Sequence, residues 1–259
     1  MPLMSDVLKR PRLASKFGEK APARGGSLAA FRAMLPTLAL VGALWSLSSW
    51  GYYALVSAMG LDSGYDEASV LFAAYYVLWA SVVLLIFRPV FKGLLSRPVF
   101  FGHALALAPI LIGYGAFVSL ALPLLPDVSV FRAPSNPPEF MFASAWYYLP
   151  KSADILFQQV LVAAIVVRAH RAGMALGGIS VMLALLFGGF HLTLAFSGFS
   201  PLYVARFTLA ATIFGLVIPW LYLRSRHGFR WAYALHWGFY ALDAVITHLL
   251  LAVPAWMME

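Results

Sequence analysis

The segment KSADILFQQVLVAAIVVR, residues 151–168, carries Asp154, Gln158 and Gln159 within a stretch whose other interior residues are apolar. An α-helix repeats every 3.6 residues, so Asp154 and Gln158 lie one turn apart on one face. A charge at membrane depth costs roughly 3 kcal/mol on insertion scales. Polar side chains of this kind usually face a bundle interior, a water-filled cavity or a partner protein. We therefore expect this face to form one wall of a buried polar site.

The composition of the whole chain indicates a membrane protein. Of its 259 residues, 62% are hydrophobic and 11% are charged, and the mean hydropathy is +0.84. Soluble domains do not need so much apolar surface. The strands of an outer-membrane barrel would alternate apolar and polar residues, whereas these segments are apolar all round. The sequence therefore predicts an all-α polytopic membrane protein with a single helical bundle over residues 31–259.

Seven segments reach the length of about 20 apolar residues that a transmembrane helix needs. They are residues 31–58, 68–88, 99–125, 152–168, 174–197, 201–222 and 231–253. Residues 1–30 precede them with six Lys and Arg side chains, and we expect this region to be a flexible cytoplasmic tail. It does not resemble a secretory signal, because the next apolar run has full spanning length and no cleavage site of small residues follows.

The charges of the connections predict the orientation of the chain. The connections at residues 88–98, 168–172 and 223–230 are basic, like the tail, whereas the alternate ones are acidic, mixed or uncharged. The mixed one precedes the fourth span, and we count Lys151 among its charges. Because Lys and Arg prefer cytoplasmic connections, we expect the N-terminus inside and the C-terminus outside. The expected location is the cell membrane, with the bacterial inner membrane favoured.

Charge and cysteine content exclude several classes of function. The net charge is +8, but the basic residues lie mainly in the tail and in short connections, so we expect no nucleic-acid partner. A basic tail can instead rest on anionic lipid headgroups. The chain has no Cys, which excludes disulfides, thiol catalysis and thiolate metal sites.

The region before Asp154 is predicted to lie at the outer surface. Residues 123–138 contain several Pro residues and other loop formers, which indicates an extended external loop. Residues 140–148 are rich in aromatic side chains, and we expect a short interfacial helix there. Pro150 is expected to separate this helix from the helix that carries Asp154.

Two later spans offer polar side chains to the same site. His191 ends the pattern Phe-Gly-Gly-Phe-His in the fifth span, and His236, Tyr240 and Asp243 share one face of the seventh. At 1.5 Å per residue from the nearest cytoplasmic Arg, Asp154 and Asp243 lie about 20 Å deep but His236 only about 9 Å. Either the seventh helix begins further out, or it is tilted or broken, or His236 lies outside the site.

The other ionisable residues of the spans receive no role in this site. Arg206 is expected to snorkel to the outer headgroups. His248 is expected at the outer interface, on a different face from Asp243. His103, His170 and His227 lie at or near cytoplasmic boundaries.

The order of three motifs resembles that of the CAAX-protease and bacteriocin-processing (Abi) family of intramembrane proteases. The family motifs are Glu-Glu-x-x-x-Arg, Phe-x-x-x-His and His-x-x-x-Asn. Residues 153–158 resemble the first, residues 187–191 match the second, and residues 236–240 resemble the third at the histidine. The resemblance covers about residues 150–244, with similar separations between the motifs.

Several family positions carry different residues in this chain. Ala153 stands at the position of the first glutamate, Asp154 at that of the second, and Gln158 at that of the arginine. In the third motif His236 matches, whereas Tyr240 replaces the asparagine. Of the family's functional residues, only the two histidines are unchanged.

The resemblance implies an intramembrane endopeptidase, a hydrolase that activates water to cleave a membrane-associated protein or peptide. Under this interpretation Asp154 is the base, and His191 shares that role or holds the water. Tyr240 or His236 donates a hydrogen bond to the oxyanion that hydrolysis produces. No cofactor is expected. The expected partners are membrane lipid and the substrate, with a membrane protein complex as a further option.

Four other interpretations stay open. The chain could be a pseudo-enzyme or scaffold that keeps the bundle and only binds a partner. The polar side chains could pair across helices merely to hold the bundle together. His191 and His236 could be the axial ligands of a haem. Asp154 and Asp243 could form the proton relay of a transporter.

Overall fold

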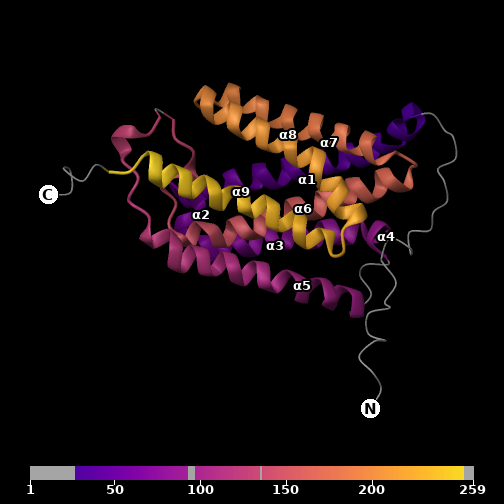
Figure 1. Ribbon diagram of the computed structural model, residues 1–259, viewed down its shortest axis with the longest axis horizontal. Helices are drawn as coiled ribbons and strands as arrows, with labels where there is room; N and C mark the ends of the chain where they lie inside the picture. The colour runs from indigo at the N-terminus through magenta and orange to yellow at the C-terminus, as the bar shows by residue number, and fades with distance from the viewer. Residues whose placement is uncertain (1–26, 93–96, 135, 254–259) are drawn as a thin grey trace, which may run out of the picture.

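The computed structural model describes residues 27–92, 97–134 and 136–253, with side chains omitted for residue 27 and residues 97–100. Most of the predicted basic tail lies outside these residues. The described part is a bundle of helices in which a single bridge, Val128 to Ala252, is the only β-type pairing. Figure 1 shows the long helices running side by side along the longest axis of the molecule.

Seven helices of the described part are long, and shorter turns join them. The long helices are α1 (Ser27–Met59), α3 (Ser69–Ile86), α5 (Arg97–Ala116), α6 (Tyr148–Arg171), α7 (Leu176–Leu192), α8 (Pro201–Arg224) and α9 (Gly228–Leu250). The short α-helices are α2 (Gly64–Glu67) and α4 (Arg88–Phe91). A π turn, η2 (Phe117–Ala121), extends α5, and the 3-10 turns are η3 (Leu122–Leu124), η4 (Val130–Arg132), η5 (Glu139–Phe142), η6 (Ala145–Tyr147) and η7 (Thr193–Ser197).

Six of the described helical segments are long and apolar enough to cross a membrane, which confirms the predicted all-α, multi-pass membrane protein. The seventh long helix, α9, has 23 residues but is not among these six. It carries the polar residues Arg230, His236 and Asp243. In Figure 1 the α6–α7 and α8–α9 connections lie at one end of the bundle, and the segment between α5 and α6 lies at the other. The predicted direction of insertion stays a prediction.

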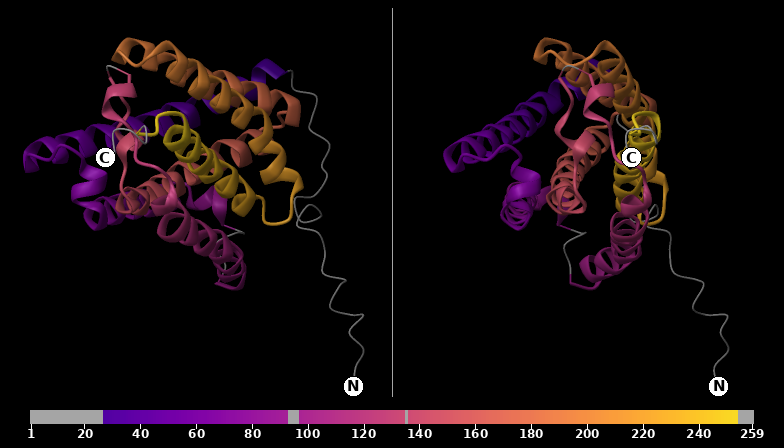
Figure 2. Two further views of the ribbon diagram at one scale, coloured as in Figure 1. Left: turned by 60° about the vertical axis from the view of Figure 1, so that its left-hand side comes forward. Right: turned by 90° about the vertical axis from the view of Figure 1, so that its left-hand side faces the viewer.

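Helix α6 lies at the centre of the bundle. Of its 24 residues, 17 are buried, and it contacts α1, α3, α7, α8 and α9. Figure 2 shows α6 between α3 and α9, with α5 at the edge of the molecule next to α9. The small and β-branched residues 160–167 allow this close approach from several sides. The buried polar side chains of α6, Lys151, Asp154 and Gln159, therefore face other helices rather than lipid.

The N-terminus of α6 differs from the prediction. Pro150 does not separate two helices, because α6 begins at Tyr148 and Pro150 lies in its first turn. A proline is tolerated there, since the N–H that it lacks would have no acceptor within the helix. Lys151, which we placed in a connection, is consequently a buried residue of α6. The predicted interfacial helix over residues 140–148 is instead the pair of 3-10 turns η5 and η6.

Glycines bring α7 and α8 close together. A Cβ atom on Gly215 of α8 would overlap the backbone of Ala184 in α7, and one on Gly188 of α7 would overlap the hydroxyl of Thr212. Small residues at such contacts let the backbones of transmembrane helices approach closely. This contact fixes the C-terminal half of α7, which carries His191 next to its last residue, Leu192.

Candidate functional site

A cavity of about 210 Å³ lies between α1, α6, α7, α8 and α9. Its walls are mainly aromatic, with contributions from Trp45, Phe187, Phe190, Phe207, Phe214 and Phe239. Its polar lining residues include Gln158, Gln159, His191, His236, Tyr203 and Tyr240. Gln158, His191, His236 and Tyr240 thus line one cavity, as predicted, whereas Asp154 and Asp243 do not line it.

The imidazole of His191 is held by its own helix. Its Nδ1 lies 2.8 Å from the carbonyl oxygen of Phe187, one turn earlier in α7. A carbonyl can only accept a hydrogen bond, so Nδ1 carries the hydrogen and Nε2 keeps a lone pair. The ring also stacks on Phe207 of α8, with 6.3 Å between centroids and an interplanar angle of 25°. His191 therefore brings a fixed hydrogen-bond acceptor to the cavity.

The imidazole of His236 is held by α6. Its Nδ1 lies 3.0 Å from Nε2 of Gln159, whose Oε1 accepts a hydrogen bond of 2.7 Å from the hydroxyl of Tyr222. With the amide in this orientation, Gln159 donates to Nδ1, so Nε2 of His236 carries the hydrogen. The two histidines of the cavity therefore have opposite tautomers: His191 offers an acceptor and His236 a donor.

The predicted depth mismatch has a structural explanation. His236 is not level with Asp154 but with Gln159, which lies five residues further along α6 and about 7.5 Å closer to the predicted cytoplasmic end. Gln159 is only 1% exposed and makes one of the side-chain contacts between α6 and α9. The role of Gln159 could not be predicted from the sequence, because its partner His236 lies 77 residues away in the chain.

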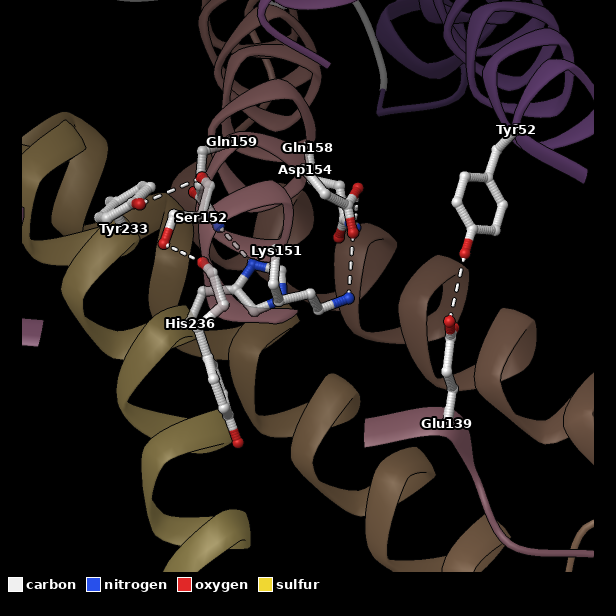
Figure 3. A network of polar contacts seen from close by, with 10 residues as sticks. Tyr52, Glu139, Lys151, Ser152, Asp154, Gln158, Gln159, Tyr233 and His236 are labelled. Carbon is white, nitrogen blue, oxygen red and sulfur yellow. Dashed lines mark hydrogen bonds and ion pairs between the residues drawn. The ribbon is translucent and has the colours of Figure 1, made fainter. Parts of the chain in front are cut away.

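Asp154 is buried and has two partners on its own helix. Its Oδ2 accepts a hydrogen bond of 3.0 Å from Nζ of Lys151, and its Oδ1 accepts one of 2.8 Å from Nε2 of Gln158. Figure 3 shows the Lys151 side chain directed toward Asp154 and away from His236. The carboxylate does not line the cavity itself and is connected to it by Gln158, which does. The spacing of three residues between Lys151 and Asp154 could have revealed the pair in the sequence.

Lys151 links this ion pair to the cavity. Its Nζ lies 4.4 Å from the ring centroid of Tyr240 and 5.9 Å from that of Tyr65 in α2. The Tyr240 ring also stacks with the imidazole of His236, with 5.8 Å between centroids and an interplanar angle of 25°. A cation above an aromatic face is attracted by the ring quadrupole. Tyr240 is therefore positioned by the ammonium on α6 and the imidazole on α9.

Asp243 belongs to a separate ion pair outside the cavity. Its Oδ1 lies 2.8 Å from Nη2 of Arg206, and its side chain is only 2% exposed. Arg206 was expected to extend to the headgroups, but the buried carboxylate on α9 holds it instead. His248 lies in the last turn of α9, where Nδ1 is 2.9 Å from the carbonyl oxygen of Pro126. Because Asp154 and Asp243 each have their own cation, the proton-relay interpretation has little support from the geometry.

The segment between α5 and α6 contributes an aromatic side chain that covers part of the site. Phe140 of η5 is buried and packs against Phe207 and Tyr240, with centroid distances of 5.6 and 6.0 Å. The preceding residue, Glu139, accepts hydrogen bonds from Ser63 at 2.6 Å and Tyr52 at 3.4 Å. Figure 3 shows the Tyr52–Glu139 contact. The sequence placed this segment at the headgroups and gave no indication of its contact with the cavity.

The size and chemistry of the cavity limit what it can hold. Its volume lies below the roughly 300–1,000 Å³ that is usual for pockets enclosing drug-sized ligands. It could hold water and a small polar group, whereas a haem would need more room between α7 and α9. Among the described residues, no three His, Asp or Glu side chains are grouped so that they could bind a metal ion.

Comparisons of the chain with protein-family models, with curated proteins and with solved structures found no match. The resemblance to the Abi family therefore stays a prediction from the three motifs.

Proposed function

We propose that the protein is an intramembrane hydrolase that cleaves a peptide bond of a membrane-associated protein or peptide. The observation that supports this most is the pair of histidines with opposite tautomers on one cavity. Hydrolysis needs a base that takes a proton from water and a donor that stabilises the oxyanion. Imidazoles supply both functions when their tautomers are fixed.

In the proposed reaction His191 is the general base. Its Nε2 lone pair takes a proton from a water molecule in the cavity, and the water oxygen attacks the carbonyl carbon of the substrate. The hydrogen bond of 2.8 Å from Nδ1 to Phe187 keeps the lone pair on Nε2 and holds the ring in place. As the carbonyl oxygen gains negative charge, Nε2–H of His236 donates to it. The proton on His191 then passes to the leaving amine.

Asp154 has a different role from the one expected from the motif. Both its oxygen atoms accept hydrogen bonds, from Lys151 and Gln158, so it is a poor candidate for the base. Because Gln158 donates its amide hydrogen to Asp154, its Oε1 is available to accept a hydrogen bond inside the cavity. We assign Asp154 and Lys151 as positioning residues for Gln158 and Tyr240.

The same ion pair favours a second candidate function, which is binding without hydrolysis. A carboxylate neutralised by Lys151 no longer resembles the free acidic group of the family motif. In that case the cavity would bind a small polar group of a membrane partner as a pseudo-enzyme. For both candidates the proposed setting is the cell membrane, with the bacterial inner membrane favoured.

Comparison of new protein N-termini in membranes tests the proposal. Cells would express the wild-type chain, His191→Ala, His236→Ala or the control His170→Ala, whose side chain is exposed at the end of α6. We expect cleavage products that depend on the wild type, persist in His170→Ala and disappear in both cavity variants at equal membrane abundance. Products that persist in His191→Ala would refute the assignment of the base. If no cleavage product depends on the wild-type chain, the proposal of hydrolysis is wrong, and binding without hydrolysis is the candidate function that is left.

A further inference from the structure

A second group of polar side chains lies outside the cavity, at the corner between α8 and α9. His227 forms this corner with a left-handed backbone (φ 57°), and Gly228 follows, packed so tightly on Leu221 that a Cβ atom would overlap its carbonyl. Arg226 and Arg230 flank the histidine. The tight turn therefore presents three basic side chains at the N-terminus of α9, where the helix dipole adds partial positive charge.

Two nitrogen atoms of this corner are buried without a partner. Nε of Arg230 and Nδ1 of His227 have no hydrogen-bond partner among the described residues. The two ion pairs in the described part of the chain lie elsewhere, and the sequence has no Asp or Glu between residues 155 and 242. Burial and the nearby Arg226 and Arg230 hold the pKa of His227 below its usual 6.5. The corner is thus rich in donors and lacks an anion.

Helix α5 borders the corner from the other side. The ring of His103 lies 5.7 Å from that of His227, at an angle of 85°. The guanidinium of Arg230 lies 4.3 Å from the ring centroid of Trp231, which keeps it close to the helix surface. Planar guanidinium groups bind phosphate well because they donate two parallel hydrogen bonds.

An apolar groove begins at the same tryptophan. It has a volume of about 400 Å³ and is lined by Val217 and Leu221 of α8 and by Trp231, Ala234 and Leu235 of α9. Trp231 and Leu235 are 44% and 38% exposed. The groove extends from the basic corner along two helices into the predicted membrane-spanning region, so polar and apolar parts adjoin as they do in a phospholipid.

We propose that the corner and the groove form one binding site for an anionic phospholipid, with its phosphate on Arg230 and His227 and an acyl chain in the groove. Basic clusters at the cytoplasmic ends of transmembrane helices attract anionic headgroups. The predicted orientation places this corner at the cytoplasmic leaflet, where anionic lipids are abundant. A free phosphate ion would use the same donors but would leave the groove empty.

Thermal unfolding of the full-length protein in detergent tests the site. Phosphatidylglycerol at about ten times its Kd should raise the midpoint by roughly 3–6 °C. Phosphatidylcholine and inorganic phosphate should have little effect. Arg230→Gln should abolish the shift, whereas the control Arg224→Gln, an exposed arginine at the end of α8, should retain it. His227→Asn provides a second variant, because asparagine tolerates the left-handed backbone.

Three results would overturn the proposal. An unchanged lipid shift in Arg230→Gln or in His227→Asn would show that the phosphate binds elsewhere. A shift of the same size with inorganic phosphate would identify a site for a free anion rather than a lipid. A lipid shift that survives Leu235→Asn unchanged would show that the groove holds no acyl chain.

Discussion

Replacing Asp154 by leucine is expected to destabilise the protein, although leucine suits a membrane helix better than aspartate. The substitution leaves the Lys151 ammonium without its carboxylate at a place where the two side chains are 11% and 10% exposed. Removal of one partner of a buried ion pair typically costs about 3–5 kcal/mol. The Tyr240 ring remains 4.4 Å from Nζ, and a cation–π contact of at most about 2 kcal/mol offsets only part of this loss.

The expected net loss of about 2–4 kcal/mol corresponds to a fall of roughly 4–16 °C in Tm for a chain of this size. Removing both charges has a different consequence. In the double variant Lys151→Met with Asp154→Leu, no charge is left unpaired, and apolar side chains replace the buried pair. Such replacements are often neutral or stabilising, so its Tm should be close to or above that of the wild type.

Thermal unfolding of full-length variants in one detergent, followed by tryptophan fluorescence, measures both effects. Arg168→Met is the control for loss of a positive charge, because Arg168 is exposed on the same helix. The reasoning is wrong if Asp154→Leu alone leaves Tm unchanged. It is also wrong if the losses in Tm of Lys151→Met and Asp154→Leu, each measured alone, simply add in the double variant. The two side chains would then have no interaction energy.

Three further predictions concern other contacts. Gly215→Ala should cost about 1–3 kcal/mol in thermal unfolding, because its Cβ meets the backbone of α7, whereas Gly113→Ala, with open space around it, should cost little. Gln159→Leu should leave Nδ1 of His236 without its donor, and ¹⁵N NMR of histidine-labelled protein should then show mixed tautomers instead of one. Lowering the pH from about 7.5 to about 5.5 should destabilise the lipid-free protein through His227, since a folded-state pKa below 6.5 lets the unfolded chain bind the proton first. This part of the pH dependence should disappear in His227→Asn, whereas an equal dependence in that variant would contradict the assignment.

The helices could be predicted from the sequence because lipid leaves the backbone few alternatives. Apolar runs of spanning length must satisfy their own N–H and C=O groups, and in this composition they do so as helices. Polar side chains are costly in lipid, so Asp154, His191 and His236 were expected to face other helices rather than lipid. The polar residues that line the cavity could be predicted from residue type and helical spacing, because both are local properties of the chain.

The partners of these groups could not be predicted in the same way. Arg206 and Asp243 lie on different helices, and their pairing depends on how α8 and α9 are rotated relative to each other. Lys151 was wrongly placed in a connection, because Pro150 was taken to mark a helix boundary. Proline also occurs in the first turn of a helix, as it does in α6. The packing of Phe140 on Tyr240 depends on the path of the segment between α5 and α6, which has no periodic pattern.

The pairing of Lys151 with Asp154 on one helix also bears on how the chain is made. The hydrogen bond between Gln159 and His236 cannot form until His236 has been synthesised, 77 residues later. At usual elongation rates this takes about 4–15 s. During that delay α6 leaves the ribosome and the insertion machinery without its later neighbours. Because Lys151 and Asp154 are only three residues apart, they can neutralise each other at once. The central helix thus carries its own counter-ion into the bilayer before α7, α8 and α9 exist.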